Sequence, residues 1–346
     1  MAINRSRFFS LPSMASSPQN DADGIAHYRA PFWLPGGHAQ TIYASRWVKK
    51  PAVRYWRERW ETPDFDFIDL DWIDLEDESA HLNAPNLTPL VVLFHGLEGH
   101  SGSAYACALM QAVQTAGWHG VVVHFRGCSG EPNRLPRAYH SGDSAEIDWI
   151  LKRLRLSRQG PIHAVGVSLG GNALLKWLGE QAEKAHPILN SAAAICAPVD
   201  LAAASDCLGR GFNRFYTKNF LASLKAKTLQ KMKRYPALCD RRSLLACKTL
   251  RAFDDLVTAP LHGFKGVDDY YTRSASKPWL QSIRLPTLMI NPLNDPFLPA
   301  RFLPTADALS DSVMLVCPPS GGHVGFVSAP FPGSITWLAQ RILQFF

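Results

Sequence analysis

Short apolar runs alternate with helical patterns from residue 89 to the end of the chain. Tyr105 to Thr115 has helical spacing and is closed by Gly117, and a second amphipathic segment runs from Ile335 to Phe345. Six apolar runs are predicted to be buried strands: 90–94, 120–125, 162–167, 192–196, 287–290 and 313–316. Continuous apolar strands separated by helices predict an α/β fold with a mostly parallel central sheet flanked by helices.

Two further patterns extend this outline. In residues 55–75, aromatic and aliphatic side chains alternate with aspartates, which predicts antiparallel edge strands that lead into the sheet. Asp143 and Glu146 stand three residues apart, as in a capping box, and predict the start of a helix that runs to about Leu156.

Residues from about 200 to 275 interrupt the alternation with a long helical segment. Aromatic and leucine side chains recur there at helical spacing: Phe212, Phe215, Tyr216, Phe220 and Leu224. Between Arg210 and Arg251, twelve Lys or Arg residues stand against one acid, Asp240, a net charge of +11 in a chain whose total is +7. We expect a helical lid, whose basic face either is simply solvated or meets anionic lipid.

Composition and cysteine usage narrow the class of protein. A chain of 346 residues that is 47% hydrophobic is consistent with one domain at 26–346 that carries the insertion, after a disordered tail at 1–25. Seven dispersed cysteines without CxxC spacing predict reduced thiols in a cytoplasmic protein, with no metal site. No run is long enough to span a membrane, no secretory signal is recognisable, and no nucleic-acid recognition motif accompanies the charge. The sequence does not define an oligomeric state.

The stretch Gly166-Val167-Ser168-Leu169-Gly170 lies between a predicted strand and a predicted helix. Strand, Gly-x-Ser-x-Gly and helix is the context of a nucleophile elbow, in which a sharp turn exposes the serine hydroxyl. The same turn places Ser168 at a helix N-terminus, where backbone N–H groups favour developing negative charge. We therefore predict that Ser168 is a nucleophile.

A serine nucleophile needs a base, and the base needs an orienting acid. In the chain order Ser, Asp, His, the acid follows a late strand and the histidine lies near the C-terminus. Asp295 follows the strand at 287–290, and His323 lies in a glycine-rich loop after the strand at 313–316. We favour Asp295 as the acid. Asp200, after the strand at 192–196, is the rival and also fits as a helix N-cap.

The tetrahedral intermediate of ester cleavage needs two N–H donors. We assign them to the backbones of Leu169, which follows the nucleophile, and Leu97, in the loop after the first long strand. His95 precedes the serine in chain order, so we expect it to form a structural hydrogen bond within that loop.

These residues resemble the α/β-hydrolase superfamily and, more narrowly, the AB hydrolase 4 family. Besides the serine elbow, the resemblance rests on five segments: 32–41 (FWLPGGHAQT), 95–99 (HGLEG), 125–133 (FRGCSGEPN), 294–296 (NDP) and 322–326 (GHVGF). It covers about residues 30–345 and implies that Ser168, Asp295 and His323 are the charge-relay residues. It also implies ester substrates, acylglycerols and phospholipids among them.

Two of these segments have alternative interpretations. Residues 32–41 either wrap the sheet edge without touching substrate or belong to the site. The loop from Arg126 to Arg137 either binds an anionic substrate group or is held by the acids Glu131 and Asp143.

The sequence thus predicts a serine carboxylesterase that needs no metal or organic cofactor and acts on a small-molecule or lipid ester. The alternatives are a phospholipase or lipase at the surface of an anionic membrane, and a hydrolase-fold binding protein with little turnover.

Overall fold

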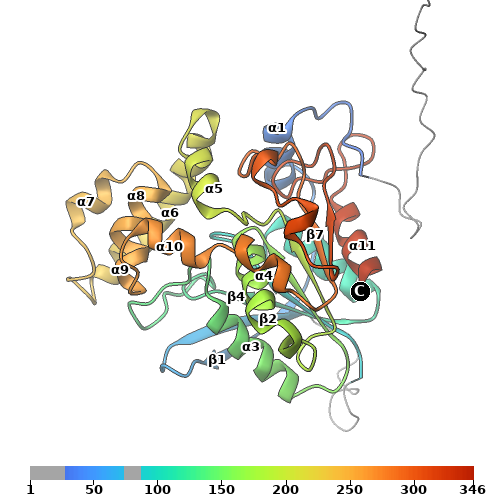
Figure 1. The fold of residues 1–346 in the computed structure, drawn as a ribbon, viewed down its shortest axis with the longest axis horizontal. Coiled ribbons are helices and arrows are strands. Elements are labelled where there is room, and N and C mark those ends of the chain that lie inside the picture. Colours follow the sequence, from blue (N-terminus) through green and yellow to red (C-terminus); the bar gives the residue numbers. More distant parts are fainter. Residues whose placement is uncertain (1–27, 74–86) are drawn as a thin grey trace, which may run out of the picture.

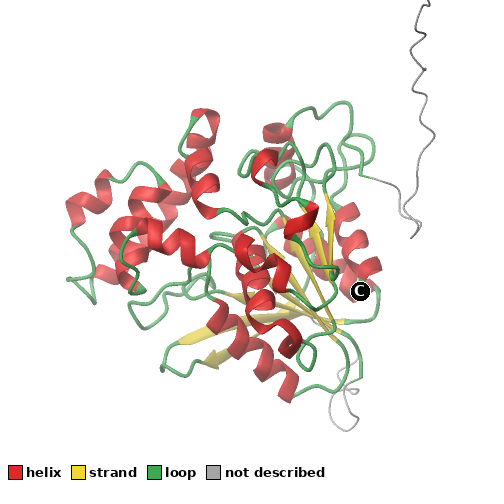
Figure 2. Ribbon diagram, in the orientation of Figure 1, coloured by secondary structure: helices red, strands yellow, loops and turns green. Residues whose placement is uncertain are grey.

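The computed structural model describes residues 28–73 and 87–346, so the predicted tail at 1–25 lies outside the described residues. One sheet of eight strands runs through the molecule, in the order β1-β2-β4-β3-β5-β6-β7-β8 (Figures 1 and 2). Its strands are β1 (Tyr55–Glu61), β2 (Phe67–Ile73), β3 (Leu90–Phe94), β4 (His119–His124), β5 (Ile162–Val167), β6 (Ser191–Ile195), β7 (Thr287–Ile290) and β8 (Val313–Val316). From β4 to β8 all neighbours pair in parallel, which confirms the predicted α/β architecture.

The first two strands form the antiparallel edge that the alternating pattern predicts. β1 pairs with β2, and β2 pairs with β4, both antiparallel. Two of the aspartates in the alternating pattern, Asp69 and Asp71, are buried and held by arginines of the neighbouring strand. Arg57 reaches Asp71 and Arg59 reaches Asp69, each at 2.7 Å. Cross-strand pairing of opposite charges therefore sets the register of this edge.

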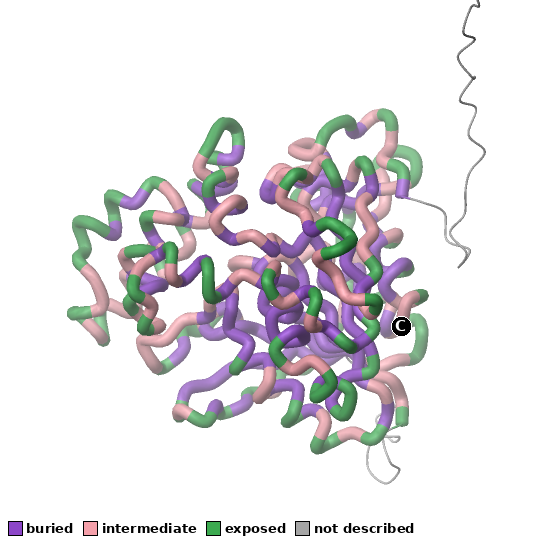
Figure 3. The backbone as a smooth tube through the Cα atoms, viewed as in Figure 1, coloured by how far each residue is buried: buried purple, intermediate pink, exposed green. Residues whose placement is uncertain are grey.

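Helices cover both faces of the sheet, as continuous apolar strands require. α3 (Ser144–Leu156) and α4 (Leu169–Gln181) share one buried cluster with Leu90, Val92 and Phe94 of β3. α2 (Ala104–Thr115) and α11 (Thr336–Phe345) share the other with Val91 and Leu93. Successive residues of one strand thus enter opposite cores, and Figure 3 shows burial concentrated around the sheet.

Between β6 and β7 the chain forms a helical cap, which Figure 1 shows as a group beside the sheet. Its α-helices are α5 (Leu201–Leu208), α6 (Arg214–Met232), α7 (Arg241–Ala246), α8 (Leu250–Phe253), α9 (Ala259–Leu261) and α10 (Val267–Ser274). The cap has a buried cluster of its own, which includes Tyr216, Leu244 and Phe253 and reaches Phe297 beside β7. Within the described residues, no helix combines the length and apolar character needed to cross a membrane.

Local departures from the sequence predictions have tertiary causes. The pair Asp143 and Glu146 does not form a capping box, because the two carboxyl groups bind Arg137 and Arg126 instead. Phe212 precedes α6, in a short 3-10 turn, so the predicted aromatic stripe is split.

The segment at 32–41 contributes a helix that the pattern did not indicate, α1 (Gly37–Arg46). This helix has little amphipathic contrast, and its Thr41 lies against the loop of His323.

Candidate active site

Ser168 occupies a strained turn at the carboxyl end of β5. Its φ of 53° and ψ of −117° are unusual for a residue with a side chain, and its N–H donates to the Ile195 carbonyl at 2.8 Å. A Cβ at Gly166 would lie 2.5 Å from the Gly170 carbonyl oxygen, and one at Gly170 would lie 2.4 Å from that of Phe94. Only glycine permits this approach of strand and helix, which gives the motif its spacing.

The structure brings Ser168, His323 and Asp295 into one line of hydrogen bonds. The Ser168 Oγ lies 2.9 Å from His323 Nε2, and His323 Nδ1 lies 2.9 Å from Asp295 Oδ2. Asp295 is almost fully buried, and its Oδ1 accepts the Phe297 N–H at 2.8 Å. The Phe297 ring stacks on the His323 imidazole with centroids 4.0 Å apart. The hydrogen bond to Asp295 and this stacking together fix the orientation of the imidazole ring.

Asp200, the rival acid, performs the capping role that its sequence position suggested. Its Oδ1 accepts the Ala203 N–H at 3.1 Å at the start of α5, and its Oδ2 lies 3.5 Å from Lys277. Only Asp295, of these two acids, forms a hydrogen bond with His323 among the described residues.

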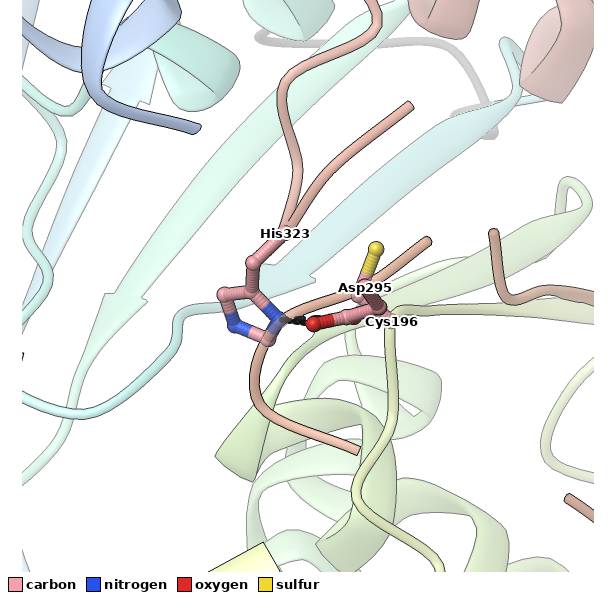
Figure 4. Close-up of side chains that lie close together, drawn as sticks. All are labelled: Cys196, Asp295 and His323. Carbon is pink, nitrogen blue, oxygen red and sulfur yellow. Dashed lines mark hydrogen bonds and ion pairs between the residues drawn. The ribbon is translucent and has the colours of Figure 1, made fainter. Parts of the chain in front are cut away.

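Cys196 stands beside the acid and the base. Figure 4 shows the Asp295 carboxyl group directed at the His323 ring with Cys196 next to it, and donor atoms of the three lie within 4.8 Å of one another. The set is that of a metal site by residue type. However, burial raises the pKa of the Cys196 thiol well above its ordinary value, whereas metals bind the thiolate. The Cys196 sulfur instead accepts the Val324 N–H at 3.2 Å, next to His323.

The loop at 95–99, which contains the predicted oxyanion donor Leu97, lies against Ser168. A Cβ at Gly96 would be 3.1 Å from the Ser168 Cβ. Tyrosine hydroxyls accept the N–H groups on either side of Leu97: Tyr105 that of Gly96 at 3.0 Å, and Tyr139 that of Glu98 at 2.9 Å.

The Leu97 N–H lies between these two hydrogen-bonded N–H groups and has no hydrogen-bond partner among the described residues. The N–H of Leu169 has none there either. Both assigned donors are therefore available, as an oxyanion hole requires.

Glu98 connects the same loop to the cap. It adopts a φ of 58°, and its side chain accepts hydrogen bonds from Tyr139, from Ser223 and from Lys227, the last at 2.8 Å. Ser223 and Lys227 belong to α6, so this cap helix is hydrogen-bonded directly to the loop at 95–99. Sequence reasoning missed this link, because it joins residues more than 120 positions apart.

The segment at 32–41 supports the loop that contains His323. The Thr41 hydroxyl accepts the His323 N–H at 2.8 Å, and the Gln40 amide oxygen accepts the Gly321 N–H at 2.9 Å. Gln40 also accepts from Asn294, the neighbour of Asp295, at 3.0 Å. The helix α1 therefore holds both the His323 loop and the Asn294 loop in place.

The remaining polar residues of the family segments have structural partners. His95 donates from Nδ1 to the Gly96 carbonyl at 2.7 Å and accepts the Phe125 N–H at Nε2, which confirms its expected role in the loop. Arg126 is buried and held by Asp64, Asp66 and Glu146.

For Arg126 the interpretation as a held arginine is therefore confirmed, although the acids that hold it differ from the expected ones. Asp143 holds Arg137 at the end of the same loop, as expected, whereas Glu131 pairs with Arg59.

Two cavities meet at Ser168 and His323. The first, of about 380 Å³, extends under the cap, and its walls include Leu201, Leu208, Phe220, Leu250, Phe253 and Val257. The second, of about 410 Å³, lies between the sheet, α1 and α6, and its walls include Ile42, Ala108, Phe215, Phe326, Leu338 and Ile342. A substrate with two apolar arms on either side of a reactive carbonyl would fit this arrangement.

A model of the alpha/beta hydrolase fold matches residues 89–330. With this match, and with the segments that resemble its AB hydrolase 4 branch, the chain belongs to the α/β-hydrolase family.

Three relatives are similar to the chain over most of its length. The chain is 40% identical over 308 residues, 88% of each chain, to a protein of Escherichia coli (strain K12) named "Putative esterase YheT". It is 28% identical over 355 residues to the human protein "Phospholipase ABHD3", covering 98% of this chain and 86% of that one. It is also 26% identical over 280 residues to "Monoacylglycerol lipase" of Saccharomyces cerevisiae, covering 78% of this chain and 61% of that one.

Solved structures share the fold. The esterase Pf2001 of Pyrococcus furiosus superimposes with a TM-score of 0.51 at 14% identity, covering 85% of this chain and 90% of that one. The mouse alpha/beta hydrolase domain-containing protein 10 gives a TM-score of 0.50 at 13% identity, covering 83% and 96%. The family and the relatives together support hydrolase activity for this chain.

Proposed function

We propose that this protein is a serine carboxylesterase that cleaves short- to medium-chain esters, acylglycerols among them, through an acyl-enzyme. One observation carries the proposal: the hydrogen-bonded line from Ser168 through His323 to Asp295 lies where two largely apolar cavities meet. The names of the relatives, esterase, phospholipase and lipase, agree with ester chemistry.

In the proposed reaction, the Ser168 Oγ attacks the ester carbonyl carbon while His323 Nε2 takes its proton. The Asp295 carboxylate accepts the Nδ1–H and stabilises the imidazolium. The negative oxygen of the tetrahedral intermediate receives the N–H groups of Leu97 and Leu169.

His323 then gives its proton to the leaving alcohol, and the acyl group stays on Ser168. A water molecule enters, loses a proton to the same imidazole and releases the acid. These steps need only the side chains and backbone groups named, so the proposal includes no metal and no organic cofactor.

The test is a series of p-nitrophenyl esters of increasing acyl length. We expect measurable kcat/KM values that rise with chain length and then fall, because a cavity of about 380 Å³ rewards apolar contact until it is full. Release of p-nitrophenol is followed by absorbance. If purified protein hydrolyses no ester of any length, the fold serves binding alone and the esterase proposal is wrong.

A second candidate function is lipid hydrolysis at a membrane surface, and one surface favours it. Phe212 and Phe215, around the start of α6, are 56% and 46% exposed. Arg214 and Lys218 are exposed on the same turn of α6. Phe215 also lines the second cavity, so apolar and basic side chains border a route to the nucleophile. Exposed aromatic residues beside basic ones are typical of membrane-interface segments.

Not every basic residue of the cap belongs to this surface. Lys225 donates to the carbonyls of Leu245 and Cys247, and Lys231 donates to those of Pro136 and Arg137. The net charge of +11 therefore overstates what the cap offers to a partner, because part of it binds the protein itself.

We expect the protein to co-sediment with anionic vesicles at low salt and to lose this binding at high salt. Replacing both Arg214 and Lys218 with glutamine should weaken partitioning about thirtyfold, since each basic side chain near the surface contributes about 1 kcal/mol. Hydrolysis of a small soluble ester should hardly change.

The matched control replaces Lys233 and Arg234, which are exposed farther along the cap, and removes the same charge. Equal weakening by both pairs would mean that net charge alone acts, and no binding by the wild type would leave this surface merely solvated.

A further inference from the structure

The cavity beneath the cap has apolar side chains in its walls and polar ones among them, including Glu98, Lys227 and Lys231. A separate polar cluster, called the polar end below, consists of Asp254, Thr258, Tyr271 and Ser205, and Ser168 and His323 line the same cavity. The four polar residues come from η4 (Asp254–Thr258), α10 and α5, so three cap elements converge there. η4 is a single turn of π-helix, a rare conformation that is frequent at functional sites.

These side chains form one hydrogen-bonded network. Asp254 Oδ1 accepts from the Thr258 hydroxyl at 2.7 Å, and Oδ2 accepts from the Tyr271 hydroxyl at 2.8 Å. The Tyr271 oxygen lies 2.9 Å from the Ser205 hydroxyl. A carboxylate has about four acceptor positions, so the network leaves capacity on Asp254 for a further donor.

Asp254 is a partly buried acid whose pKa is shifted. Burial raises the pKa of its carboxyl group to about 6, and among the described residues no basic side chain forms an ion pair with it. An apolar residue of similar size would avoid this desolvation. Perturbed ionisable groups that line a cavity are candidates for ligand recognition.

We propose that the polar end of the cap cavity is a binding subsite for a hydrogen-bond donor, a hydroxyl or ammonium group, at the far end of the substrate arm that lies under the cap. Asp254 is the acceptor, and the Tyr271 and Thr258 hydroxyls hold its carboxyl group in place. The inference rests on the proposed esterase function for its catalytic readout, and it adds the chemical character of the substrate's distal end.

The test compares esters that differ only at that end. One series has p-nitrophenyl esters of alkanoic, ω-hydroxyalkanoic and ω-aminoalkanoic acids over a range of lengths. The other has short-chain esters of simple alcohols, diols and amino alcohols, which probes the case in which the alcohol arm enters the cavity. At the length that spans the cavity, we expect about a tenfold or larger preference in kcat/KM for the donor-bearing ester, as a hydrogen bond to a charged group provides.

Asp254→Asn should reduce this preference, and Asp254→Leu should reverse it in favour of the plain alkyl ester. Asp255→Asn is the matched control, because Asp255 belongs to the same π-helical turn and is exposed. It should leave the preference unchanged. If Asp254→Leu fails to fold, the kcat/KM preferences of Asp254→Asn and Asp255→Asn for the donor-bearing ester still test whether Asp254 binds that group.

A binding measurement separates this inference from the esterase proposal. Calorimetry with wild-type protein compares ω-hydroxy and ω-amino acids with fatty acids, and diols and amino alcohols with simple alcohols, at matched lengths. Tighter binding of a donor-bearing ligand, weakened by Asp254→Asn, would support the subsite even if no ester were hydrolysed. Equal binding, together with equal kcat/KM values in both ester series, would overturn it.

Discussion

Replacing Ser168 with alanine should lower kcat for p-nitrophenyl esters about a million-fold, to the residual rate that binding and the oxyanion donors supply. The expectation follows from the geometry, since Ser168 Oγ is the only hydroxyl hydrogen-bonded to His323 Nε2 among the described residues. Alanine has no oxygen that could carry the acyl group, so the variant cannot form an acyl-enzyme. Steady-state absorbance of p-nitrophenol measures the effect.

A fluorophosphonate probe provides an independent readout of the same residue. Intact-mass spectrometry should show one adduct on the wild type, located on the peptide that contains Ser168, and none on the alanine variant. Ser223→Ala is a useful comparison, because Ser223 is a second hydroxyl in the cap cavity but bonds Glu98. Labelling that persists in the Ser168 variant, or that is lost only in the Ser223 variant, would show that another nucleophile acts.

Much of the sheet could be predicted because burial on both faces leaves a direct mark on composition. β3, β5 and β6 are buried at every position, and apart from His163 of β5 each is a run of apolar or small residues in the sequence. The edge strands were recognisable by alternation, but the aspartates of β2 are buried as well. Their arginine partners lie on the neighbouring strand, and a single strand's pattern contains no information on them.

The candidate relay residues were recognisable for a different reason. A nucleophile elbow needs glycines at defined spacing, and the order Ser, Asp, His places the acid and the base after particular strands. The supports of those residues had no such signal. Gln40 and Thr41 hold the His323 loop from 281 and 282 positions away. No general rule of spacing or chain order connects these two residues to the loop.

The cap shows where local patterns are insufficient. Helical spacing indicated its aromatic residues, but tertiary contacts decide which way they face. Tyr216 packs against Phe297 with centroids 4.9 Å apart, whereas Phe215 of the preceding position is exposed. Asp254 is a similar case, since one acid of a pair in a polar helix resembles a solvated residue until the cavity beside it is known.

The choice between the two candidate acids leads to the other large expected effect. Asp295→Asn should lower kcat about ten-thousand-fold, because an amide in this position no longer stabilises the imidazolium and favours the wrong tautomer of His323. Asp200→Asn should cost far less in kcat, since an asparagine side chain still caps α5 and Asp200 does not contact the imidazole in the described structure.

The two variants are matched in chemistry and differ only in site, which makes their ranking informative. Circular dichroism and thermal unfolding establish that both are folded, and kcat is then measured with the same ester. We expect Asp200→Asn to lower the melting temperature slightly through its weakened contact with Lys277, and Asp295→Asn to act on kcat. A larger loss of kcat in the Asp200 variant would move the orienting acid to the end of β6, and equal small losses would mean that neither carboxylate orients the base.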